Sequence, residues 1–172
     1  MKIFTLLILL SFFQCASYNK TVFISKHTNP KIPKNDRAEI LHILSELNEM
    51  FRQKDLARLP AYVSEKKGLY VDLKALRTHT QLTEEIKNPD SHLNVFFLST
   101  EKLRIKTNDS EQISVRDILL KNRKINTEFF CNDTLNECEV ILHLDRTKEL
   151  NFRLNNPYFI KENGKWYIYR LM

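Results

Sequence analysis

The side chains of this sequence best suited to acid–base chemistry are Tyr70 and Asp72, with His79, His92 and His143 as further candidates. Tyr70 and Asp72 alternate with apolar residues in the stretch 69–73, and side chains two positions apart in a β-strand project from the same face. A phenol and a carboxylate on one face could bind a small ligand or exchange protons with it. Such a strand face is also often simply solvated, so the pattern favours binding over catalysis.

Three cysteines carry the second kind of chemistry: Cys15, Cys131 and Cys138. Cys131 and Cys138 flank a polar turn between two strand-like stretches, and an antiparallel hairpin would place them opposite each other. We predict a disulfide, which indicates an oxidising compartment. A zinc site with His143 is the alternative, but no second histidine follows it, so we expect no metal. His143 alternates with apolar residues on its strand and is expected in solvent.

Sequence motifs for known chemistries are lacking. No stretch has the pattern Gly-x-Ser-x-Gly or His-Glu-x-x-His, and only 2 glycines are available for phosphate-binding loops. The net charge of +6 is spread along the chain rather than gathered in a stripe, which disfavours a nucleic-acid partner. We therefore expect no cofactor, no nucleic acid and a non-catalytic protein.

The first 14 residues have the pattern of a signal peptide: Lys2 and then the apolar run 3–13. A bilayer span needs about 20 apolar residues, so this run fits a signal peptide better than a transmembrane helix. Cleavage before Cys15 would leave a lipidated cysteine, whereas cleavage after Ser17 would release the protein. Either route leaves the other two cysteines as an even pair. The loose lipobox and the proline-containing stretch 15–35, a plausible tether, favour the lipidated Cys15.

The elements that must position these residues are predicted from periodicity. A long helix with one apolar face is expected from an N-cap at Asn35 to Phe51, and shorter helices at 55–59, 80–87 and 114–120. Strands are expected at 69–73, 92–98, 127–131, 138–144, 150–154, 158–160 and 166–169. The apolar patch 22–24 is expected to be a short edge strand or a docking segment.

The end of the chain is aromatic, and Asn163-Gly164 predicts a tight hairpin turn within it. The aromatic residues there are Tyr158, Phe159, Trp166, Tyr167 and Tyr169. We predict core packing and cross-strand pairing for them, with a ligand-binding surface as the alternative. Helices first and strands last predict one α+β domain, 36–172. In it, N-terminal helices pack on a curved antiparallel sheet formed mainly by the C-terminal third.

Two resemblances add expectations. The long helix, the short helix after Asp55 and the end of the chain around Gly164–Ile168 resemble nuclear transport factor two-like (SnoaL-like) domains. That resemblance implies a cone-like fold with a pocket between the long helix and the sheet. The stretches 62–64, 67–74, 114–119 and 155–167 resemble a group of uncharacterised spirochaete, chiefly leptospiral, lipoproteins. This second resemblance implies an envelope location, favours lipidation of Cys15 and brings no activity.

Two functions follow as expectations. The first is a membrane-anchored bacterial lipoprotein, at the outer membrane or cell surface, whose domain binds an envelope protein or a host matrix component. The second is a secreted cone-fold domain that binds or converts a small ligand near Tyr70 and Asp72. A deep apolar pocket would favour the second, and a filled core the first.

Overall fold

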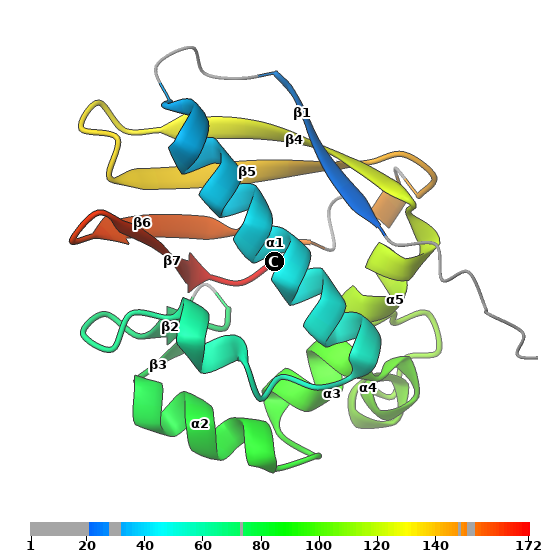
Figure 1. Ribbon diagram of the computed structural model, residues 1–172. Coiled ribbons are helices and arrows are strands. Elements are labelled where there is room, and N and C mark those ends of the chain that lie inside the picture. The colour runs from blue at the N-terminus through cyan, green and yellow to red at the C-terminus, as the bar shows by residue number, and fades with distance from the viewer. Residues whose placement is uncertain (1–20, 28–31, 73, 148, 151–153) are drawn as a thin grey trace, which may run out of the picture.

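The structure is a computed structural model that describes residues 21–27, 32–72, 74–147, 149–150 and 154–172 (Figure 1). It is an α+β domain, as predicted, with five α-helices, a short 3-10 helix and seven strands in the described residues. The predicted signal peptide and the anchor at Cys15 lie outside these residues.

The seven strands form one mixed sheet in the order β1-β4-β5-β6-β7-β2-β3. Their bounds are β1 Val22–His27, β2 Leu69–Tyr70, β3 Leu76–Arg77, β4 Lys124–Cys131, β5 Glu137–Leu144, β6 Tyr158–Glu162 and β7 Lys165–Arg170. The C-terminal strands β4 to β7 pair antiparallel, as expected. The strands β1 and β2, from the first half of the chain, pair parallel with β4 and β7. The apolar patch 22–24 is therefore the edge strand rather than a docking segment.

Helix α1 (Lys34–Gln53) lies diagonally across one face of this sheet (Figure 1). Its apolar positions have the predicted helical spacing, and Ile40, Leu44 and Leu47 are fully buried. Phe159 and Trp166 in the sheet are also 0% exposed, and both belong to the same apolar cluster as these helix residues. Side chains thus fill the space where the cone resemblance implied a pocket.

The predicted N-cap at Asn35 is wrong. The helix starts at Lys34, directly after Pro33, whose backbone is extended (φ −57°, ψ 145°), and Asn35 lies in the first turn. Acidic residues of the first two turns join the helix to the last hairpin instead. Asp36 pairs with the Lys161 ammonium at 2.7 Å, and Glu39 accepts a hydrogen bond from the Trp166 amide at 3.0 Å.

Three of the remaining helices gather near the C-terminal end of α1, and the fourth, which comes first in the chain, lies beside β3 (Figure 1). The four helices are α2 His79–Lys87, α3 His92–Leu98, α4 Thr100–Thr107 and α5 Val115–Lys121. The predictions for α2 and α5 are confirmed: a Thr78 capping box starts α2, and Ser114 caps α5. None of the helices in the described part of the chain is both long and apolar enough to cross a membrane.

Two predicted elements are wrong. The stretch 92–98 is helix α3 instead of a strand. The Ser91 hydroxyl accepts the Asn94 amide at 3.2 Å and so starts a helix, which the mostly apolar composition of the stretch did not reveal. The stretch 55–59 is not a helix either, because the Asp55 carboxylate caps a tight turn and a 3-10 helix follows at Leu59–Tyr62. The strand predicted at 150–154 lies mostly outside the described residues.

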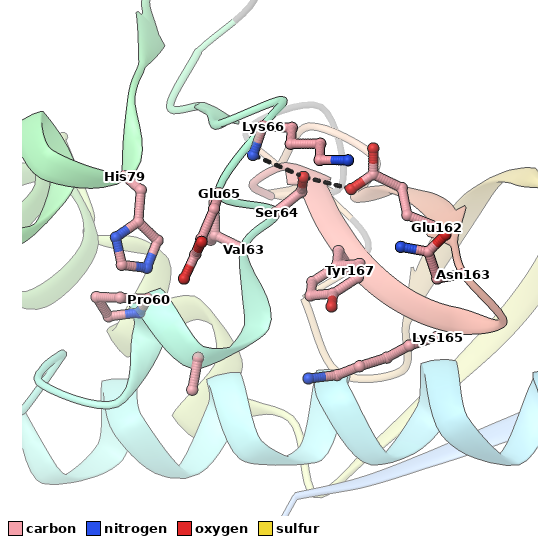
Figure 2. Close-up of a pocket in the computed structure, with 11 residues that line it drawn as sticks. Pro60, Val63, Ser64, Glu65, Lys66, His79, Glu162, Asn163, Lys165 and Tyr167 are labelled. Carbon is pink, nitrogen blue, oxygen red and sulfur yellow. Dashed lines mark hydrogen bonds between the residues drawn. The ribbon is translucent and has the colours of Figure 1, made fainter.

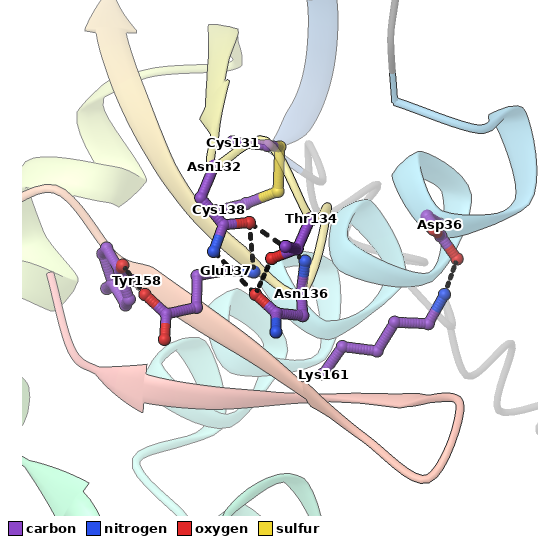
Figure 3. Close-up of a disulfide and its surroundings, with 9 residues drawn as sticks. All are labelled: Asp36, Cys131, Asn132, Thr134, Asn136, Glu137, Cys138, Tyr158 and Lys161. Carbon is purple, nitrogen blue, oxygen red and sulfur yellow. Dashed lines mark hydrogen bonds and ion pairs between the residues drawn. A yellow bond between two sulfur atoms is a disulfide. The ribbon is translucent and has the colours of Figure 1, made fainter.

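The predicted disulfide between Cys131 and Cys138 is present, with Cα atoms 4.0 Å apart in directly opposed positions of β4 and β5 (Figure 3). The Asn132 side chain holds the turn by accepting the amides of Asn136 and Glu137 at 3.1 and 3.2 Å. His143 is exposed and lies 3.3 Å from Glu128, on the face opposite the disulfide. The zinc alternative is therefore wrong. No cluster of three potential metal ligands exists among the residues that the structure describes.

Candidate functional site

Tyr70 and Asp72 do not share a strand face. Strand β2 ends at Tyr70, and the Asp72 carboxylate reverses the chain by accepting the amides of Lys74 and Ala75, both at 2.7 Å. These two hydrogen bonds to the ionised form hold the pKa of Asp72 below its usual value. The two predicted residues consequently line separate cavities.

Asp72 meets His92 at a cavity of about 550 Å³, which we call the Asp72–His92 cavity. Helix α3 brings His92 there, and its ring stacks on Phe96, one turn later, at 4.0 Å between centroids. The cavity is also lined by Gln112, Asn155 and Met172. Burial lowers the pKa of His92, although the nearby Asp72 carboxylate opposes the shift. At neutral pH the cavity therefore presents a carboxylate, a neutral imidazole and an aromatic wall, which suits an apolar ligand with a donor group.

His79 lies at a second cavity, of about 290 Å³, between the 3-10 helix and the turn of the last hairpin (Figure 2). Ser64, which sequence reasoning missed, is 2% exposed at its edge. Its hydroxyl donates to Glu162 and accepts the amides of Lys66 and Lys67 at 3.2 and 3.1 Å. These bonds run to a carboxylate and to the loop backbone rather than to His79, so they tie the loop to the hairpin and do not activate a nucleophile.

The third cavity, of about 330 Å³, contains Tyr70 and lies on the outer face of the sheet, defined here as the face turned away from α1. Tyr70, Tyr158 and Tyr169 form its tyrosine cluster. The Tyr169 ring centroid lies 5.2 Å from that of Tyr70 and 6.4 Å from that of Tyr158. Glu137 and Arg170 complete the lining.

A break in the register between β6 and β7 brings the residues of this cluster together. Tyr158 pairs with Arg170 but Phe159 pairs with Ile168, so Tyr169 is an extra residue in β7. Such a bulge re-aims side chains. It lets both Tyr169 and Arg170 line the cavity, whereas strict alternation would place them on opposite faces. The sequence signal was the aromatic end of the chain, but the bulge itself has no signature in the sequence.

Hydrogen bonds and ion pairs fix the polar edge of the cluster. The Tyr158 hydroxyl donates to Glu137 at 2.6 Å (Figure 3), and burial together with this carboxylate raises the pKa of Tyr158 to about 12. Arg170 pairs with Glu139 at 2.7 Å and lies 5.5 Å from the centre of the Tyr158 ring.

The aromatic end therefore divides between two roles. Phe159 and Trp166 are buried in the core, as predicted, whereas Tyr158, Tyr167 and Tyr169 are half-buried on the outer face. Comparison of the chain with protein-family models, curated proteins and solved structures found no match.

Proposed function

We propose that this protein is a membrane-anchored bacterial lipoprotein whose α+β domain binds a partner outside the cytoplasm without catalysing a reaction. The observation that carries the export part of the proposal is the disulfide between Cys131 and Cys138, which suits an oxidising compartment. The lipid anchor is supported by the sequence, in which Cys15 directly follows an apolar leader. The resemblance to spirochaete lipoproteins points the same way.

A binding role is supported by where the reactive side chains lie. Of the five candidate side chains, only Asp72 and His92 come together, at one cavity. Tyr70, His79 and His143 lie on other surfaces of the domain. The filled space between α1 and the sheet also favours a partner surface over a cone-type pocket. The outer face, with its half-buried tyrosines and the 51% exposed Phe130, is the surface that we assign to a partner, an envelope protein or a host matrix component.

The anchor is tested on protein expressed in a bacterium that lipidates exported proteins. Mass spectrometry of the mature N-terminus should find Cys15 carrying acyl chains, and the protein should partition into detergent. Cys15→Ser should block lipidation, whereas Ser17→Ala, which alters the alternative cleavage site, should leave it unchanged. A mature N-terminus at Tyr18 without lipid would contradict the proposal.

The Asp72–His92 cavity favours a second candidate function, the binding of a small ligand. Its volume of about 550 Å³ lies within the range of known small-molecule sites, and Asp72 supplies a fixed negative charge. Benzylamine, which joins an aromatic ring to a cation, should bind more tightly than benzyl alcohol, and Asp72→Asn should abolish the difference. Equal binding of both probes to the unmodified protein would argue against this function.

A further inference from the structure

The tyrosine cluster presents three aromatic rings to one cavity. Tyr70 and Tyr169 are inclined at 87° and Tyr158 and Tyr169 at 56°, so ring faces and edges surround a common space of about 330 Å³. The face of an aromatic ring carries negative electrostatic potential, which attracts cations within about 6 Å of the ring centre. Arg170 already makes such a contact with Tyr158, at 5.5 Å.

The charges around the cavity leave one carboxylate uncompensated. Arg170 is neutralised by Glu139 at 2.7 Å and donates its Nε–H to the Asn156 carbonyl at 3.1 Å. Glu137 accepts only the Tyr158 hydroxyl among the side-chain hydrogen bonds of the described residues, and no cation of that part of the chain forms an ion pair with it. The second carboxylate thus gives the site a net negative charge.

The Tyr158 hydroxyl is already engaged, because it donates to Glu137 at 2.6 Å. The rings of Tyr70 and Tyr169 pack edge to face, with their centroids 5.2 Å apart. The lining of the cavity is therefore mostly aromatic, with Glu137 as its carboxylate acceptor. A primary ammonium needs acceptors for its three N–H groups and is strongly hydrated, whereas a quaternary ammonium has no N–H and binds to ring faces.

We infer that the tyrosine cluster and Glu137 form a binding site for an organic cation, specifically a trimethylammonium group such as that of choline. The inference rests on the proposed binding function of the outer face but not on the lipid anchor. The group could come from free choline or from a phosphatidylcholine headgroup, which share this chemistry.

The test compares choline with 3,3-dimethylbutan-1-ol, its uncharged isostere, by calorimetric titration of the purified mature protein in octyl glucoside. Choline should bind at least about tenfold more tightly than the alcohol, because the two molecules have the same shape and only choline carries a positive charge. Equal binding of the two probes, or no binding of choline, would overturn the inference.

Variants locate the site. Tyr169→Leu should weaken choline binding about tenfold, and Glu137→Gln should weaken it severalfold by removing the charge at unchanged size. Tyr167→Leu is the matched control, because Tyr167 is a half-buried tyrosine of the same strand that lines the second cavity, beside His79 and Ser64, instead. Circular dichroism checks folding, and Glu137→Gln decides the matter if Tyr169→Leu does not fold. Equal losses in Tyr167→Leu and Tyr169→Leu, or no loss in Glu137→Gln, would overturn the assignment.

Two bilayers separate the sources of the group. For protein reconstituted in phosphatidylglycerol, the affinity for free choline should match that in detergent. A weaker apparent affinity for free choline in phosphatidylcholine would show that lipid headgroups occupy the site. An unchanged affinity would show that the ligand is free choline. If the protein carries lipid at Cys15 but does not bind choline, only this inference is overturned. If the protein binds choline but carries no lipid, only the proposed anchor is overturned.

Discussion

The two faces of the sheet contrast in what they bury. The inner face holds Trp166, Phe159 and Val140 at 0% exposure against helix α1, while the outer face of the same strands carries tyrosines, carboxylates and His143. A two-residue period separates the two sets along β5, where buried and accessible positions alternate throughout. The inner face therefore supplies stability, whereas the outer face is available for recognition.

The largest effect should come from the inner face. Trp166→Ala removes a fully buried side chain and should lower the free energy of unfolding by about 3–5 kcal/mol. Tyr167→Ala, one position along on the outer face, should cost clearly less because its side chain is only half-buried. Urea denaturation of both variants measures the difference, and equal losses would show that the two faces do not differ in this way.

The disulfide should have the next largest effect. The bridge spans a sequence separation of 7 and pins β4 to β5. Changing Cys131 and Cys138 together to Ala should cost roughly 2.5 kcal/mol by chain-entropy arithmetic and leave the fold intact. Thermal melting followed by far-UV circular dichroism measures the loss of stability and shows whether the fold is intact. Free thiols in the denatured, non-reduced protein from an oxidising compartment would contradict the bridge.

The turn that joins β6 to β7 supports both faces through backbone conformation alone. Asn163 and Gly164 have φ of 50° and 82°, as the predicted tight turn requires, and a Cβ atom at Gly164 would meet nothing within 4 Å. Gly164→Val should therefore cost on the order of 1 kcal/mol or more from backbone strain only. Asn163→Gly, which tolerates the same φ, is the control. An unchanged melting temperature for Gly164→Val would argue against the strain.

The smallest effect is a pH dependence on the outer face. The pKa of Tyr158 is raised from 10.0 to about 12 in the folded protein, chiefly by burial and then by Glu137. Its contribution to stability is fully present below pH 10 and is lost as the pH rises toward 12, because the unfolded chain ionises first. Tyr158→Phe should flatten the fall in melting temperature across this window. A fall of the same size in both proteins would show that another group is responsible.

Sequence reasoning worked where one signal decided the structure. The alternation in 138–144, the Ser114 cap and the Asn163-Gly164 turn each specify their element locally, and all three are confirmed. The stretch 92–98 is short and mostly apolar, so it has no clear period to distinguish a helix from a strand, and the prediction of a strand was wrong.

The candidate sites were harder to predict than the elements. Asp72 belongs to a turn because its carboxylate binds two backbone amides, which separates it from Tyr70. His92 reaches Asp72 only because α3 is a helix, and Tyr169 joins Arg170 at one cavity only through a bulge. Each of these placements depends on tertiary geometry rather than on local spacing.

The position of β1 at the sheet edge limits how far the domain can stand from a membrane. The sheet already includes Val22, and the described chain starts at Thr21, six residues beyond Cys15. At 3.3–3.6 Å per residue, six residues reach at most about 20 Å. With the proposed lipid on Cys15, the start of β1 would therefore stay within roughly one bilayer leaflet's thickness of the headgroups. Such a short connection would orient the domain relative to the membrane and bring its surfaces to the lipid at high effective concentration.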